Sequence, residues 1–367
     1  MNLNGGFQGR KVLITGHTGF KGSWLTAWLV KLGAEVTGFS LDVPTQPAMF
    51  EVLGLASRIR HVQGDVRDVA AVSKLVNELR PDFVFHLAAQ AIVSVSYDNP
   101  VETVTTNVTG TMAVLEALRT LDKPCSAVLI TSDKCYENVE WVWGYRENDR
   151  LGGKDVYSGS KGAAELIIKS YLWSFFQGDH PVRLAVGRAG NVIGGGDWAR
   201  DRIVADCVRA WNDGRPVEIR NPQATRPWQH VLEPLSGYLW LALSLAMRKN
   251  LHGEAFNFGP RAEQNHSVAD LIGDLSRHWG FSNFPDACRV TGSTVFHEAG
   301  LLKLNCDKAL SELRWEPTLD YGGTTKLVSD WYRSYYRGGA DMYALTMQQI
   351  AEFEGIASER KQAWCNT

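Results

Sequence analysis

Residues 11–22 read Lys-Val-Leu-Ile-Thr-Gly-His-Thr-Gly-Phe-Lys-Gly, an apolar run followed by three evenly spaced glycines. Glycine permits a tight turn and lets the backbone approach a pyrophosphate closely. A helical pattern follows, and a helix N-terminus presents unpaired N–H groups and the positive end of its dipole to phosphates. Because the glycines lie between a first strand and a helix, the segment predicts a dinucleotide-binding turn.

Outward from this turn, short β-branched runs alternate with longer helical patterns. The predicted strands are residues 11–15, 35–40, 60–63, 82–87 and 127–131, and the predicted helices are 22–32, 69–79 and 101–121. Strands that alternate with helices of this length favour a parallel sheet covered on both faces. The fold class is therefore α/β, a doubly wound parallel sheet of Rossmann type.

The second half of the chain has a looser pattern. A helix over 157–176 is followed, after Arg188, by loops with Gly and Pro and by helices near 201–211, 233–249 and 268–279. This pattern predicts a dinucleotide-binding domain over 1–190 and a smaller mixed α/β substrate lobe over 191–367. The boundary is soft, and segments are free to cross it.

Composition excludes several classes of protein. A formal net charge of −2 over 367 residues gives no bulk attraction for nucleic acid or an anionic membrane. The N-terminus lacks a signal-peptide pattern, and no run of 18 apolar residues is present. Six scattered cysteines favour free thiols in a reducing compartment, and nine histidines show no metal-ligand spacing. A cytoplasmic protein without metal, acting on a small molecule, is expected.

The glycine spacing at 16, 19 and 22 and the Tyr157-x-x-x-Lys161 pair resemble the extended short-chain dehydrogenase/reductase family. The resemblance runs from about Gly9 to Tyr332. It implies a bound nicotinamide dinucleotide, with Asp65 at the adenine amino group and residues 86–90 along the nicotinamide. The implied cofactor-binding residues are Gly16, Thr18, Gly19, Phe20, Lys21, Gly22, Ser40, Asp42, Asp65, Val66, Leu87, Ala88, Ala89, Asn107, Tyr157 and Lys161.

Two cofactor positions leave alternatives open. A carboxylate at Asp42, two positions after Ser40, would repel a ribose 2′-phosphate and favours NAD over NADP, unless Asp42 is only a solvated loop residue. Asn107 resembles the family's asparagine beside the active site, or it is a polar residue on a helix face.

His17 and Lys21 are larger than the residues that relatives usually carry in this turn. Lys21 is able to pair with a phosphate, and either side chain is able to crowd the dinucleotide. The cofactor affinity is therefore expected to differ from the family norm, in a direction that the residues do not give.

The chemistry assigned to Tyr157 and Lys161 follows from their spacing. Residues four apart on a helix share one face. A nearby ammonium and the cationic nicotinamide ring both favour phenolate and so lower the pKa of the tyrosine. The phenol oxygen can then take a sugar hydroxyl proton while hydride leaves the same carbon.

Ser132-Asp133-Lys134 follows the fifth predicted strand, where catalytic groups collect in this architecture. Ser132 resembles the residue that holds the substrate hydroxyl. Sugar 4,6-dehydratases carry further acid–base residues here, because the C5 proton must be removed while the C6 hydroxyl is protonated. Asp133 is the candidate acid and Lys134 the candidate base. The opposite assignment, and Lys134 as a group that positions water or stabilises an enolate, both stay open.

The substrate side resembles two family loops. Residues 188–198 include Asn191, expected to bind the diphosphate or sugar, and residues 226–231 begin with Arg226, expected to neutralise a phosphate. Arg202 is a further candidate for the same task, as are Arg200 and Arg220, with a solvated charge as the alternative for each.

The segments TGHTGFKGSW, SLDVPTQPAMF, TSDKCYEN, NVIGGGDW and RPWQHV together resemble the bacterial CDP-glucose 4,6-dehydratase family. That resemblance implies a lyase that converts CDP-D-glucose to CDP-4-dehydro-6-deoxy-D-glucose, with NAD as a hydride carrier. In that family the product serves the synthesis of surface polysaccharides such as the lipopolysaccharide O-antigen. The alternatives are a nucleotide-sugar 4-epimerase and a dinucleotide-sensing binding protein without turnover.

The helix over 157–176 contains the segment LIIKSYLWSFF, which is apolar almost all round. One of its faces is expected to stay apolar after packing on the sheet. With the helix over 101–121, it predicts a homodimer interface, and a fully buried helix is the alternative.

Overall fold

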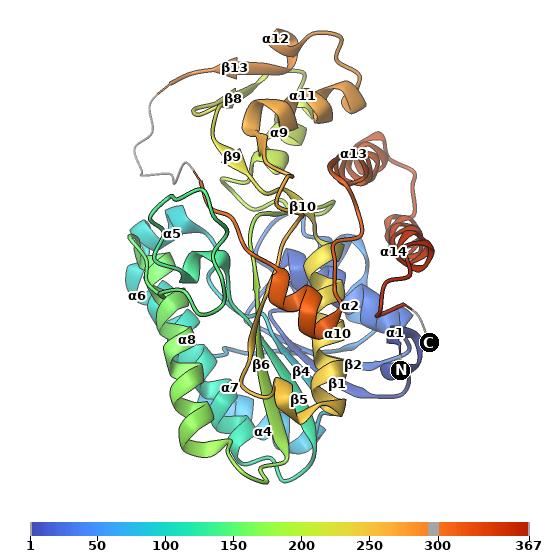
Figure 1. Cartoon of the computed structure of the whole chain (residues 1–367). Coiled ribbons are helices and arrows are strands. Elements are labelled where there is room, and N and C mark those ends of the chain that lie inside the picture. The colour runs from blue at the N-terminus through green and yellow to red at the C-terminus, as the bar shows by residue number, and fades with distance from the viewer. Residues whose placement is uncertain (1, 293–300, 366–367) are drawn as a thin grey trace.

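A seven-stranded parallel sheet forms the centre of the molecule (Figure 1). The computed structural model describes residues 2–292 and 301–365. The strand order is β11-β6-β5-β4-β1-β2-β3. The strands are β1 (Lys11–Thr15), β2 (Glu35–Ser40), β3 (Arg60–Gln63), β4 (Phe83–His86), β5 (Cys125–Ile130), β6 (Val182–Ala189) and β11 (Ala255–Phe258). The predicted doubly wound α/β fold is confirmed.

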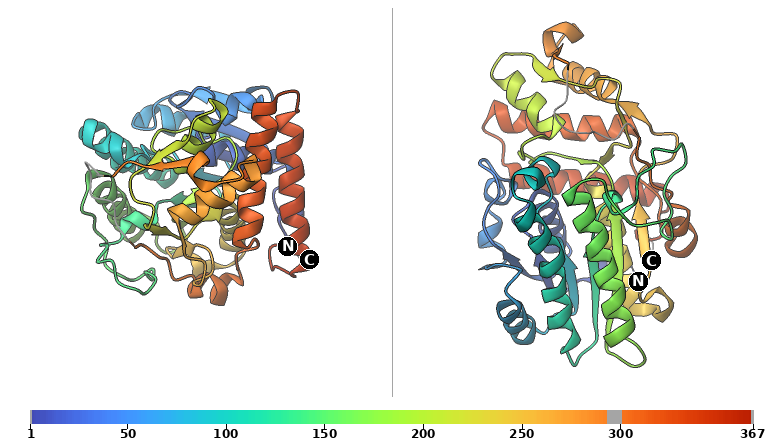
Figure 2. Two further views of the ribbon diagram at one scale, coloured as in Figure 1. Left: turned by 90° about the horizontal axis from the view of Figure 1, so that it is seen from above. Right: turned by 90° about the vertical axis from the view of Figure 1, so that its left-hand side faces the viewer.

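Helices cover both faces of the sheet (Figure 2). One layer consists of α4 (Val69–Leu79), α7 (Gly110–Arg119) and α8 (Val156–Phe175). The opposite layer contains α2 (Phe20–Lys31) and α10 (Leu232–Met247). Strand side chains alternate between the two cores, so that Ile14 packs with α2 and α10 while Leu13 packs with α4 and α7. The central strands β4 and β5 are buried on both faces and mostly apolar, whereas the edge strand β3 is largely exposed and polar.

Three two-stranded pairings build the small lobe at the carboxyl end of the sheet (Figure 1). They join β7 (Val192–Ile193) to β10 (Gln229–His230), β9 (Thr225–Arg226) to β12 (His266–Ser267), and β8 (Val217–Ile219) to β13 (Cys288–Val290). The lobe also carries α9 (Ile203–Asn212), α11 (Val268–Trp279) and α12 (Phe284–Ala287). Short helices elsewhere are α1 (Leu3–Gly6), α3 (Met49–Val52), α5 (Val93–Asp98) and α6 (Pro100–Val104).

One feature differs from the sequence-based expectation, and a second shows a segment that crosses the soft boundary at residue 190. The single helix expected over 101–121 is divided into α6, a π-helical turn at Thr105–Thr109, and α7. Strand β11, from the second half of the chain, pairs with β6 in the main sheet. The segments before and after residue 190 therefore do not form separate sheets. A domain boundary at this residue stays a prediction.

Two long helices follow the small lobe, α13 (Tyr321–Arg337) and α14 (Met342–Glu359). Helix α14 packs on α2, where Glu354 accepts a hydrogen bond of 2.7 Å from the Trp28 indole. The two ends of the chain lie together, because the amide of Leu3 donates to the carbonyl of Trp364 at 3.1 Å (Figure 2).

All six cysteines lie in the described residues and are free thiols. Over the same residues, no helix has the length and apolarity needed to cross a membrane.

The start of α2 leaves no room for a side chain at Gly22. A β-carbon there would lie 2.1 Å from the carbonyl oxygen of Gly16, which is backbone and has no way to rotate aside. We expect Gly22→Ala to lower the free energy of unfolding by about 1–3 kcal/mol because of this overpacking. Chemical denaturation measures the change.

The matched control is Gly355→Ala in α14, where a β-carbon meets no atom within 4 Å and the site is exposed. There the better helix propensity of alanine should stabilise the protein by up to about 1 kcal/mol. Equal effects of the two substitutions would contradict the crowding at Gly22.

Candidate active site

The turn between β1 and α2 has the geometry of a dinucleotide-binding loop. Gly16 has a φ of +77°, and a β-carbon there would lie 2.6 Å from the amide nitrogen of Ala88, so the turn lies directly against the loop that follows β4. Gly19 is the N-cap of α2, and no side chain caps this helix start. A diphosphate therefore fits here, with the positive end of the helix dipole facing it.

The ring of His17 lies under β2 rather than over the turn. It is fully buried, and a β-carbon at Gly38 would come within 2.3 Å of it. Its nitrogens are 2.9 Å from Ser40 Oγ and 2.7 Å from His61 Nδ1. Burial, with the nearby His61, lowers the pKa of His17 to about 4. A neutral histidine therefore ties the glycine turn to the ends of β2 and β3.

The other residues of the adenosine end lie at these strand ends. The backbone carbonyl of Asp42 accepts a hydrogen bond of 2.6 Å from the Thr18 hydroxyl, and the Asp42 side chain is exposed. The Asp65 carboxylate accepts hydrogen bonds from the Arg67 guanidinium, the shortest at 2.6 Å, and these bonds lower the pKa of Asp65. Asp65 is thus held in a fixed orientation by its own neighbour.

Lys21 points into the catalytic region. Its ammonium interacts electrostatically with Arg202, Asp133, Lys161 and Asp197. Burial, with the repulsion of Arg202 and Lys161, lowers the pKa of Lys21 to about 8, although the two carboxylates act in the opposite direction. The turn lysine therefore adds a positive charge among the catalytic groups.

The predicted catalytic residues of the strand end and helix start come together. The Ser132 hydroxyl donates to Asp133 Oδ1 at 2.8 Å and accepts from the backbone amide of Lys134 at 3.2 Å. Ser132, Asp133 and Tyr157 are all buried. Burial raises the pKa of Tyr157 to about 12, whereas its hydrogen bond with Ser132 and the charge of Arg202 lower that pKa. The groups of the protein therefore raise this pKa, which is opposite to the lowering that the sequence analysis predicts, because burial outweighs the neighbouring charges.

The two lysines that are predicted to be catalytic differ in their surroundings. Lys161 is buried one turn beyond Tyr157 on α8, and burial lowers its pKa to about 8. Lys134 is half-buried in the 3₁₀ turn Asp133–Cys135, and among the described residues its ammonium has no hydrogen-bond or ion-pair partner. Lys134 therefore follows Asp133 directly in the sequence, and no described side chain fixes the position of its ammonium.

Asn107 bridges the loop after β4 and the catalytic helix. It lies in the π-helical turn, a feature frequent at functional sites. Its Oδ1 accepts from the Gln90 amide at 2.9 Å, and its Nδ2 donates to the Gln90 carbonyl at 3.0 Å and to Ser160 Oγ at 2.8 Å. All of its polar atoms are used, so Asn107 positions Gln90 and α8.

A buried ion pair, which the sequence analysis missed, holds the catalytic strand end to the catalytic helix. Arg188 on β6 donates to both oxygens of Glu165 on α8, at 2.7 and 2.8 Å, and both side chains are at most 1% exposed. Thr131 donates to Glu165 at 2.6 Å, and Arg188 donates to Tyr136 Oη at 2.7 Å. Thr131 and Tyr136 flank the segment 132–135.

The signal for this pair was a charge in each of two apolar segments, LAVGRAGN and AAELIIK. Glu165 is four residues beyond Lys161 and therefore shares its helix face. The network continues to Asn257 of β11, whose Oδ1 accepts from Tyr136 at 2.8 Å and whose Nδ2 donates to the carbonyl of Asn305 at 3.0 Å.

The three substrate candidates lie on the small-lobe side. Arg202 donates to the carbonyl of Ala91 at 3.3 Å and lies 4.0 Å from Asp197. The side chain of Arg226 donates to the carbonyl of Thr225 at 2.8 Å, and the carbonyl of Asn191 accepts from the Gln229 amide at 3.3 Å. Arg200 pairs instead with Asp98 at 2.7 Å on an exposed surface.

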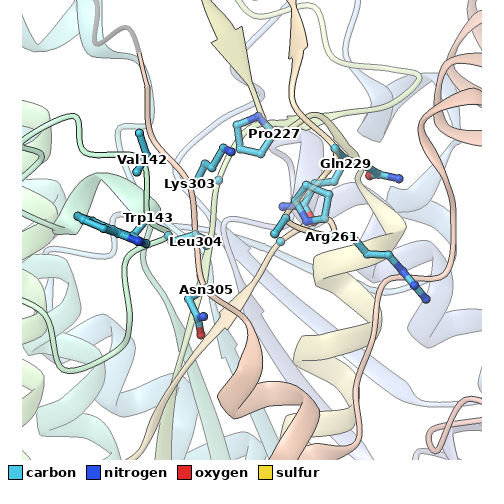
Figure 3. Close-up of a pocket in the computed structure, with 14 residues that line it drawn as sticks. Val142, Trp143, Pro227, Gln229, Arg261, Lys303, Leu304 and Asn305 are labelled. Atoms are coloured by element: carbon cyan, nitrogen blue, oxygen red, sulfur yellow. The ribbon is translucent and has the colours of Figure 1, made fainter.

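A cavity of about 210 Å³ opens beside these residues (Figure 3). Val142 and Trp143 lie to one side of the segment 303–305, and Gln229 and Arg261 lie to its other side. Within residues 2–292 and 301–365, no group of three or more His, Cys, Asp or Glu side chains is suited to hold a metal ion.

Comparison with known proteins agrees with this arrangement. The family model described as GDP-mannose 4,6 dehydratase matches residues 13–327. A CDP-glucose 4,6-dehydratase from Salmonella typhimurium is 45% identical over 352 residues, which cover 95% of this chain and 97% of the relative. A dTDP-glucose 4,6-dehydratase from Xanthomonas campestris is 25% identical, over 87% of this chain and 92% of that protein.

Solved structures share the fold. A dTDP-glucose 4,6-dehydratase from Streptomyces venezuelae, with NAD and TYD bound, has a TM-score of 0.75 at 21% identity, over 88% of this chain and 97% of that one. A UDP-glucose 4-epimerase from Thermotoga maritima, with UDP-glucose, has a TM-score of 0.76 at 22% identity, over 88% and 98%. At these identities the likeness extends to the architecture only.

Removing the charge of Glu165 should test the buried ion pair. Glu165→Gln leaves the Arg188 guanidinium buried without a counter-charge, so we expect a loss of about 3–5 kcal/mol in the free energy of unfolding. Chemical denaturation measures it. The control is Asp330→Asn, which removes the exposed pair of Lys326 and Asp330 on α13 and should change stability by less than about 1 kcal/mol. A Glu165 variant as stable as this control would contradict the structural role of the pair.

Proposed function

The chain belongs to the GDP-mannose 4,6-dehydratase family, and we propose that it removes water from CDP-D-glucose to give CDP-4-dehydro-6-deoxy-D-glucose. The observation that carries the proposal is the buried cluster of Ser132, Asp133 and Tyr157 beside Lys161. A plain epimerase needs the tyrosine and serine, whereas an elimination also needs an acid at the position of Asp133.

The proposed cofactor is NAD, which would supply a hydride acceptor for C4 of the hexose and return that hydride to C6. The glycine turn and the start of α2 would hold its diphosphate. Ser40 and Asp42 lie at the end proposed for the adenosine ribose, and an arginine for a 2′-phosphate is absent from the segment 40–43. Tyr157 and Lys161 on α8 would lie beside the nicotinamide.

The protein groups divide the proton transfers among them. Ser132 would hold the C4 hydroxyl while Tyr157 takes its proton. Asp133, whose carboxyl already accepts from Ser132, would give a proton to the C6 hydroxyl, which leaves as water. Lys134 would remove the C5 proton or stabilise the enolate that forms. The hydride taken from C4 would return to C6 and a proton would be added at C5, so the net change is the loss of one water without net oxidation or reduction.

Charge supports an anionic substrate. Lys21 and Arg202 add positive charge beside Asp133 and Tyr157, and Arg226 and Asn191 lie toward the small lobe. We assign Arg226, Asn191 and Arg202 to the diphosphate of the nucleotide sugar, because guanidinium groups suit phosphate oxygens. A cytoplasmic location stays a prediction.

We also propose a homodimer formed through α6 and α8. Trp173 and Leu166 of α8 are 73% and 56% exposed, and Val101 of α6 is 74% exposed. Apolar side chains that gather on neighbouring helices favour an interface.

Light scattering tests the dimer. The wild type should have the mass of two chains, and Trp173→Glu with Leu166→Glu should give one chain. The control is Val290→Glu, because Val290 is 56% exposed on the small lobe, remote from both helices, and its variant should stay dimeric. A monomeric wild type would refute the interface.

Isotope transfer tests the reaction. With NAD and CDP-glucose deuterated at C4, the product should carry deuterium at C6 and one solvent hydrogen at C5, because one hydride is moved within the enzyme while the C5 proton exchanges. NMR of the product reports both positions. Deuterium lost to water, or C5 without solvent hydrogen, would reject the mechanism.

Tyr157→Phe provides the control. It keeps the ring and removes the proton acceptor, so turnover should fall by about 100-fold or more.

The wild-type product also separates the alternative functions. A product with an unaltered C6 hydroxyl and an inverted C4 would identify an epimerase. Cofactor binding without turnover of any nucleotide hexose would identify a sensing protein.

A further inference from the structure

One buried side chain of the small lobe has an unused hydrogen-bond acceptor. Gln229 on β10 is 2% exposed, and its Nε2 donates to the carbonyl of Phe258 at 3.1 Å. Its Oε1 is buried and has no hydrogen-bond partner among the described residues. A buried acceptor without a donor is costly, so where a cavity adjoins such an atom the approach of a ligand donor is favoured.

Gln229 is one of the residues that line the cavity in Figure 3. Because the Nε2 of Gln229 is held by Phe258, the amide is oriented and only its acceptor remains for a ligand. The cavity wall also contains Trp143, Pro227 and Leu304, which are apolar, and Lys303. A polar ring or a hexose with one donor aimed at Gln229 would suit this lining.

The cavity adjoins the catalytic carboxyl. Gly190 is part of its wall, and a β-carbon at Gly190 would lie 2.8 Å from Asp133 Oδ2. A substrate whose hexose lies at Asp133 is therefore within one residue of this cavity. The backbone of Gly190 therefore lies between the cavity and the carboxyl of Asp133, and borders both.

We propose that Gln229 is a specificity-determining residue whose Oε1 accepts a hydrogen bond from a donor group of the nucleotide sugar. This assignment rests on the proposed function and deepens it. Two parts of CDP-glucose carry such a donor, namely the amino group of the base and the hydroxyls at C2 and C3 of the hexose. An acceptor held in one orientation selects for a donor and rejects a carbonyl oxygen at the same place.

Gln229→Met is the first test, since methionine has a similar length and neither amide group. The dissociation constant for CDP-glucose should rise about tenfold, because the donor of the ligand is left unpaired. Equilibrium binding to the NAD-loaded protein measures it, and KM should rise with it.

Gln349→Met is the matched control. Gln349 on α14 is also 2% exposed, donates from Nε2 to the carbonyl of Leu327 at 2.8 Å, and has a buried Oε1 without a partner among the described residues. It does not contribute to the cavity wall. This variant should bind CDP-glucose as the wild type does.

Substrate analogues identify the donor. UDP-glucose replaces the amino group of the base by a carbonyl, and the 2-deoxy and 3-deoxy forms of CDP-glucose each lack one hydroxyl. The wild type should bind one of these analogues about tenfold more weakly than CDP-glucose. Gln229→Met should bind that analogue and CDP-glucose with equal affinity. The variant has already lost the hydrogen bond, so removing its donor from the ligand should not weaken binding further.

The outcomes separate the two proposals. Normal turnover and binding by Gln229→Met, with no analogue weakened through Gln229, overturn the assignment and leave the dehydratase proposal standing. A wild type that binds none of these nucleotide sugars overturns both. Should Gln229→Met fail to fold, the wild type alone still decides, because equal binding of all the analogues overturns the assignment.

Discussion

The ion pair of Arg188 and Glu165 lies where the sheet, the catalytic helix and the small lobe meet. Two charges removed from water are favourable only when nearly every donor and acceptor is used, and here Thr131 and Tyr136 complete the set. Because those two residues flank Ser132 and Asp133, the bonds that satisfy the charges also fix the catalytic segment. Stability and catalytic geometry are therefore maintained by the same atoms.

Beside this ion pair, the candidate site holds several charged side chains that are buried away from water. Burial lowers the pKa values of both Lys21 and Lys161 to about 8, so each ammonium is held against the cost of its desolvation. The diphosphates of the proposed dinucleotide and nucleotide sugar would offset that cost. The family's glycine turn and tyrosine–lysine pair serve many reactions, and the carboxyl of Asp133 beside them is what suits an elimination.

The local sequence pattern predicts much of the fold. The remaining features depend on contacts between residues that are distant in the sequence. The strands at 11–15, 35–40 and 60–63 were predicted to the residue, because β-branched runs bounded by polar turns are a local signal. The π-helical turn around Asn107 and the pairing of β11 with β6 depend on partners distant in sequence. For the same reason motif spacing indicated Tyr157, Lys161 and Asp133, whereas the pairing of Glu165 with Arg188 and the inward position of Lys21 became visible only in three dimensions.

The return of β11 to the main sheet makes the two lobes inseparable in practice. The chain leaves the sheet after Ala189, builds most of the small lobe, and comes back at Ala255 to cover β6. A fragment ending near residue 190 would expose the backbone of β6 as a bare edge and would deprive Tyr136 of Asn257. Such edges recruit strands from other molecules. The amino-terminal half made alone should therefore tend to associate through β6, and the seventh strand can join the sheet only after residues 255–258 have been synthesised.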